Sequence, residues 1–168
     1  MIVNLLVVGV VGLVATMSTR YFSPQELLDR FDKGQSVYAL GDYAKAVDHY
    51  HAIIATQSNI TIDVQKVAVN VDEFILPIRV AATYQLANAH NKLGLEKLER
   101  SEILRREKKE ELAQERYDEA LQDLDVSHQY FSQLANDQTV GVRTRVMAQF
   151  QMLETSYQLK RHQQVIEQ

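Results

Sequence analysis

The hydrophobic positions of this chain form one continuous apolar run, followed by patterns spaced like the faces of helices. Residues 2–17 are almost entirely apolar. Beyond them, apolar side chains recur at intervals of three and four residues, as they do at Ala46, Tyr50 and Ile53. This spacing is typical of amphipathic helices. The pattern predicts an all-α protein whose main domain, residues 23–168, is built from paired helices.

The best-defined pattern is a helical hairpin at residues 34–54. Gly41 can adopt the left-handed conformation that ends a helix, and Asp42 can cap the next one. The first helix begins earlier, because residues 23–26 (Ser-Pro-Gln-Glu) form a capping-box pattern. Gly34 lies inside that helix, where glycine costs about 1 kcal/mol relative to alanine. We therefore expect a partner helix to approach closely at this position.

Two later stretches end in the same way as the first helix of the hairpin, at residues 92–94 (Lys-Leu-Gly) and 158–160 (Gln-Leu-Lys). The pattern predicts a helix over residues 77–93 and a final helix over residues 142–159. Residues 57–76 are rich in β-branched side chains. With no partner strand evident in the sequence, we interpret them as a helix or an irregular linker.

A charge-dense segment at residues 95–116 separates the second of these helices from the helix that would pair with it. The segment is rich in helix formers, and pairs such as Glu96 and Arg100 stand four residues apart. It has no sustained heptad, so it does not indicate a coiled coil. We interpret it as a charged helical extension that faces water, with an arm that contacts a partner as the alternative.

The small and aromatic positions of the hairpin resemble those of the tetratricopeptide repeat, a unit of about 34 residues. The matching residues of the hairpin are Gly34, Gly41, Asp42, Tyr43, Ala46, Tyr50 and Ile53. The matching residues of the later stretches are Leu86, Ala87, Gly94 and Ala120. The chain departs from the family at Lys33, where the family prefers Leu, and at Lys160, which replaces Gly. The resemblance implies TPR-like hairpins stacked as a short superhelix with a concave binding face.

Composition argues against most kinds of chemistry. The net charge of −4 does not provide the positive charge that attracts the phosphates of nucleic acid. The absence of cysteine excludes disulfides, thiolate metal sites and thiol catalysis. His49 and His51 are two residues apart, so they lie on different faces of a helix and not at metal-ligand spacing. The sequence has no phosphate-binding glycine loop or nucleophile elbow. We predict that the chain is not an enzyme and carries no cofactor or metal.

The apolar run would form a single hydrophobic helix within residues 1–22. Its length is near the lower limit for a membrane-spanning helix, which needs roughly 17–25 residues. Small residues that would let this helix pack closely on others are Gly9, Gly12, Thr16 and Thr19. Residues 2–17 are thus predicted to enter a lipid bilayer or a helix bundle. The predicted location is the cell envelope, with the repeat domain outside the cytoplasm, although the basic residues after the run favour the opposite orientation.

Two hypotheses for function follow. The first is a non-catalytic, membrane-anchored interaction scaffold or accessory subunit of a larger envelope assembly, whose partners are other protein subunits. The polar residues expected on its partner face are Gln35, Tyr38, Gln85, Asn88, Asn91 and Gln151. The alternative is a self-assembling extracellular filament subunit whose hydrophobic N-terminal helices bundle together.

Overall fold

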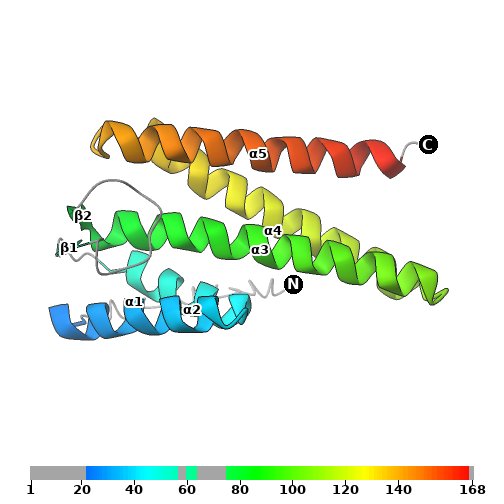
Figure 1. Ribbon diagram of the computed structural model, residues 1–168, viewed down its shortest axis with the longest axis horizontal. Coiled ribbons are helices and arrows are strands. Elements are labelled where there is room, and N and C mark those ends of the chain that lie inside the picture. Colours follow the sequence, from blue (N-terminus) through cyan, green and yellow to red (C-terminus); the bar gives the residue numbers. More distant parts are fainter. Residues whose placement is uncertain (1–21, 57–59, 64–74, 167–168) are drawn as a thin grey trace, which may run out of the picture.

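The computed structural model describes residues 22–56, 60–63 and 75–166. Within them the elements are α1 (Pro24–Ala39), α2 (Tyr43–Ile54), β1 (Thr61–Asp63), β2 (Ile75–Pro77), α3 (Ile78–Arg106), α4 (Glu110–Asn136) and α5 (Val142–Ile166). Each helix packs chiefly against the next one along the chain, so that α1 and α5 lie on opposite sides of a stack (Figure 1). The prediction of a helical protein is confirmed.

The first two helices form the hairpin that the sequence predicts. Ser23 and Glu26 exchange the two hydrogen bonds of a capping box at the start of α1. Gly41 has a φ of +81°, and the Asp42 N–H donates to the Val37 carbonyl over 2.9 Å, which closes the end of the helix. The Asp42 carboxylate then caps α2. The turn therefore follows directly from its residue types.

Gly34 marks the closest approach of α1 and α2. A Cβ atom built on it would lie 2.7 Å from the ring of Tyr50, which is completely buried. The Tyr50 ring also packs edge-on against Phe31, with 5.6 Å between the ring centroids. Only a residue without a side chain fits beside this aromatic pair. The cost of glycine inside α1 is thus offset by close helix packing.

The two strands correct the interpretation of residues 57–76. They pair antiparallel, with Thr61 opposite Pro77 and Asp63 opposite Ile75. The Ile78 N–H extends this pairing by donating to the Ile60 carbonyl over 2.9 Å. A partner strand was not evident from the sequence because it lies at the end of the same segment. A helix or irregular linker is therefore wrong for residues 61–63 and 75–76. Pro77, which was predicted to begin the next helix, ends β2 and directly precedes α3.

The structure also corrects the predicted end of the helix at residues 92–94. α3 continues through Gly94 to Arg106 without a turn. A Cβ atom at Gly94 would lie 2.9 Å from the Leu124 Cγ and 3.0 Å from the Ala120 carbonyl oxygen of α4. Gly94 thus permits a close helix approach and does not end α3. The turn predicted at residues 158–160 is wrong as well, because α5 runs on to Ile166.

The charged segment at residues 95–116 forms the tip of a long antiparallel hairpin made by α3 and α4. The turn lies at residues 107–109, where Lys108 has a φ of +61°. Leu98 and Leu104 are buried between the two helices. Ser101 is also buried, and its hydroxyl donates to the Ala113 carbonyl across the pair over 2.7 Å. The charged side chains cover the outside of a packed helix pair.

The predicted membrane-anchored location in the envelope is corrected. Over residues 22–56, 60–63 and 75–166, no helix is both long enough and apolar enough to cross a bilayer. The three longest of these helices have sufficient length, but charged residues recur along each of them. Residues 2–17, on which the prediction rested, lie outside the described residues. The same is true of Gly9, Gly12, Thr16 and Thr19.

Candidate functional site

Helix α5 has one face of small residues and one face of large apolar residues. Thr144, Ala148 and Thr155 have no exposed surface and form the face toward α4. Their spacing of four and seven residues keeps them on one side of the helix. Small side chains allow α5 to lie close to α4. Met147 and Met152 are partly buried against the core, whereas five other large apolar side chains of α5 lie on the opposite side.

The outward face of α5 carries a continuous line of exposed hydrophobic side chains, which we call the outer stripe. It consists of Val142, Val146, Phe150, Leu153 and Tyr157, each exposed over 55% to 69% of its surface. The intervals of three and four residues align them along about 22 Å of helix. In Figure 1, α5 is the outermost helix of the stack. The stripe thus faces away from the rest of the described structure.

Polar contacts from α3 fix the rotation of α5. The Asn91 side-chain amide donates to the Thr155 hydroxyl over 3.2 Å and to the Gln158 side chain over 3.0 Å. The Thr155 hydroxyl in turn donates to the Gln151 carbonyl over 2.9 Å. Turning the outer stripe inward would break these bonds and bring large side chains against α4. The exposure of the stripe follows from specific contacts on the inner face.

The exposed apolar area lies at the upper end of what monomeric proteins show. From the exposed fractions, the five side chains leave roughly 500–600 Å² of surface in water, whereas the largest patch on a typical monomer is about 300–600 Å² and is often functional. Phe150 lies at the centre of the stripe and Tyr157 at one end. Aromatic residues in such positions are typical anchors of protein interfaces.

A second candidate site is a cluster of charged and polar side chains between α3 and α4. The Nδ1 atom of His90 lies 2.8 Å from one carboxylate oxygen of Asp123, and the Lys97 ammonium lies 2.8 Å from the other. Lys97 also lies 3.3 Å from Glu119. Burial alone would raise the pKa of Asp123, but the bonds from His90 and Lys97 outweigh it and hold that pKa below its usual value.

This cluster has the parts of a histidine–carboxylate pair but not the surroundings of a catalytic one. A catalytic base needs an exposed nitrogen that reaches a substrate or a nucleophile. His90 and Asp123 are largely buried, and the His90 ring stacks on Tyr130 with 6.3 Å between centroids. Lys97 already neutralises the carboxylate. The cluster therefore acts as a charged link that holds α3 on α4.

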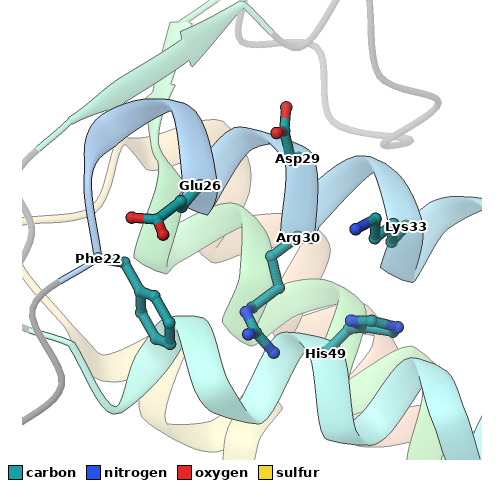
Figure 2. A pocket seen from close by; sticks show the side chains of 6 residues that line it. All are labelled: Phe22, Glu26, Asp29, Arg30, Lys33 and His49. Atoms are coloured by element: carbon teal, nitrogen blue, oxygen red, sulfur yellow. The ribbon is translucent and has the colours of Figure 1, made fainter.

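A small pocket of about 180 Å³ lies between the start of α1 and the middle of α2. Its lining consists of Phe22, Glu26, Asp29, Arg30, Lys33 and His49 (Figure 2). The Arg30 guanidinium lies over the Phe22 ring, 4.7 Å from its centroid. Burial lowers the pKa of His49, and the charges of Arg30 and Lys33 lower it further. Both signs of charge line this pocket, so it favours no single class of ligand.

The residues predicted for the partner face lie on α1, α3 and α5, and several make contacts within the chain. The Asn88 amide donates to the Gln85 side chain over 3.3 Å, and Gln85 is buried. Asn91 binds α5 as described. Gln35 is half-buried against the Tyr50 phenol, and Tyr38 packs edge-on against Tyr43. Gln151 is half-buried on α5.

The residues predicted to pack the repeats lie mostly in the interior. Gly34 contacts Tyr50, and Gly94 contacts Ala120, as described above. The buried members of the set are Ala46, Tyr50, Ile53, Leu86, Ala87 and Ala120. Gly41 is exposed in the first turn.

Sequence reasoning missed the outer stripe and the pairing of His90 with Asp123. The stripe was visible only as apolar residues of a final helix, and the pairing joins residues 33 positions apart. Within residues 22–56, 60–63 and 75–166, no group of three or more His, Asp or Glu side chains could hold a metal ion. In comparisons with known proteins, no family model, curated protein or solved structure matches the chain.

Proposed function

We propose that this chain is a non-catalytic interaction scaffold that binds another protein subunit through the outer stripe of α5. The observation that carries the proposal is the exposure of five large apolar side chains in one line, with Phe150 at the centre. Burying such a surface is the main driving force of protein association. A scaffold function also agrees with the buried, charge-neutralised state of the His90–Asp123 pair.

The proposed architecture is a short stack of TPR-like hairpins. The glycine turn at Gly41 and the close approach at Gly34 support this view of α1 and α2. The close approach at Gly94 supports it for α3 and α4. In a stack where each element contacts mainly its neighbours, α5 packs on α4 and keeps its opposite face uncovered within the described residues. The outer stripe is that face.

The chemistry of the stripe defines the partner that would fit it. A line of apolar side chains about 22 Å long matches one face of an amphipathic helix. Exposed Glu154 flanks the stripe, so the partner helix would place a positive charge beside it. The partner is thus a protein subunit that presents a helix with an apolar face and charged edges.

The test uses a photo-crosslinking phenylalanine analogue in place of Phe150, in cells that make the chain. The matched control carries the analogue at Leu40, which is 84% exposed and directly follows α1, the helix on the opposite side of the stack from α5. We expect covalent adducts with protein from position 150 and few from position 40. Equal adducts from both positions, or none from position 150, would show that the outer stripe is not an interaction surface.

A further inference from the structure

We propose that the partner of the outer stripe is a second copy of this chain, whose α5 docks antiparallel to the first across a two-fold axis near Phe150. This inference rests on the proposed function and names its partner. Two properties of α5 carry it, namely the area of the stripe and the order of its side chains.

The area of the stripe fits an interface between two copies. Each copy would contribute roughly 500–600 Å² of exposed apolar side chain. Together the two stripes would bury about 1,100 Å², and flanking polar residues would bring the total into the standard range of about 1,200–2,000 Å². A symmetric pair covers both exposed faces at once, which leaves neither copy with an open stripe.

The order of side chains makes the stripe complementary to itself when reversed. The smaller residues Val142 and Val146 occupy one half, and the larger residues Leu153 and Tyr157 occupy the other. In an antiparallel pair, the small half of one copy lies opposite the large half of its partner. A parallel pair would place the two Tyr157 side chains together and leave a gap between the valines. Close packing therefore favours the antiparallel pair.

The first experiment measures the oligomeric state of the whole chain by sedimentation equilibrium. We expect a dimer with a dissociation constant in roughly the micromolar range, given an interface at the lower end of standard size. Phe150→Glu is expected to raise that constant by at least about 100-fold, because each dimer contains the change twice. Leu40→Glu is the matched control and should leave the constant unchanged. A chain that stays monomeric, or a dimer that tolerates Phe150→Glu, would overturn the inference.

The orientation is measured with a single spin label, since the chain has no cysteine of its own. In an antiparallel dimer centred near Phe150, labels on Lys160→Cys would be separated by about 30 Å along the helix axes. A parallel dimer would bring them to about 10 Å. A short distance would therefore refute the arrangement.

The failure of this inference can be told apart from that of the proposed function. Adducts from position 150 that contain only a different protein, together with a monomeric chain, would leave the scaffold function intact and reject the second copy. An absence of adducts would reject both. Adducts that join two copies of the chain, with a dimer in solution, would support both.

Discussion

The close approach of α3 and α4 at Gly94 makes a sharp prediction for Gly94→Ala. In an exposed helix interior, replacing glycine with alanine stabilises a protein by about 1 kcal/mol. Here the new Cβ would lie 2.9 Å from the Leu124 Cγ and 3.0 Å from the Ala120 carbonyl oxygen. The oxygen belongs to the α4 backbone and cannot rotate away, so the helices must separate. Overpacking of this kind costs about 1–3 kcal/mol, and the backbone contact favours the upper half of that range. We expect a net loss of about 1–2 kcal/mol.

Urea unfolding followed by far-UV circular dichroism measures this loss, and a thermal scan should show a melting temperature lower by about 3–6 °C. Lys92→Ala, an exposed change two residues earlier on α3, is the control and should fall within about 0.5 kcal/mol of the parent. Leu124→Ala removes two of the three closest contacts of the new methyl group. In that background, Gly94→Ala should therefore cost less than it does alone.

The opposite sign would refute the packing argument. If Gly94→Ala raises stability by about 1 kcal/mol, the helices are not in contact at this position. If the cost is the same with and without Leu124, the strain does not arise from that side chain.

Three further predictions concern other contacts of the described structure. Gly41→Ala should destabilise the chain by about 1–2 kcal/mol in urea unfolding, because the left-handed backbone suits glycine, and Gly41→Asn should cost less. Ser101→Ala should cost about 1 kcal/mol and increase hydrogen exchange at the hairpin tip, because it removes a buried hydrogen bond that joins α3 to α4. Asp123→Asn should cost about 2 kcal/mol near neutral pH, because His90 and Lys97 lose a charged partner. Since the pKa of Asp123 is lowered in the folded chain, this stabilisation is present above the ordinary carboxyl value of about 3.9 and is lost as the pH falls through the folded value. The stability difference between the two chains should therefore shrink in acid, and a difference that grows below pH 4 would contradict it.

The sequence was most informative where the residues next to a glycine indicate its role. A glycine followed by an acidic cap predicts a turn, and residues 40–43 form one. The same logic was wrong at Gly94, because a glycine inside a helix serves equally for an ending or for a close contact. The difference depends on Leu124 and Ala120, which lie far along the chain. Local sequence cannot separate these two uses.

The candidate site was less predictable than the fold for a similar reason. Helix α5 carries a face of small residues and a face of large apolar ones, and hydrophobic spacing alone favours burying the large face. Asn91 determines which face of α5 points inward, because its side chain bonds Thr155 and Gln158. These bonds join residues that are more than 60 positions apart in the sequence. Likewise, no local pattern joins His90 to Asp123, which stands 33 positions away on α4. Tertiary contacts, and not local periodicity, decided both features.

The order in which the helices pack has a consequence for how the molecule opens. Because α5 packs mainly on α4 and is bonded to α3 through Asn91, its detachment would leave the contacts at Gly34 and Gly94 intact. Native-state hydrogen exchange should then detect a partial opening in which the amides of α5 exchange well before those of α3. The free energy of local opening thus differs between the helices of the stack. A molecule docked on the outer stripe would raise the protection of amides against hydrogen exchange most in α5.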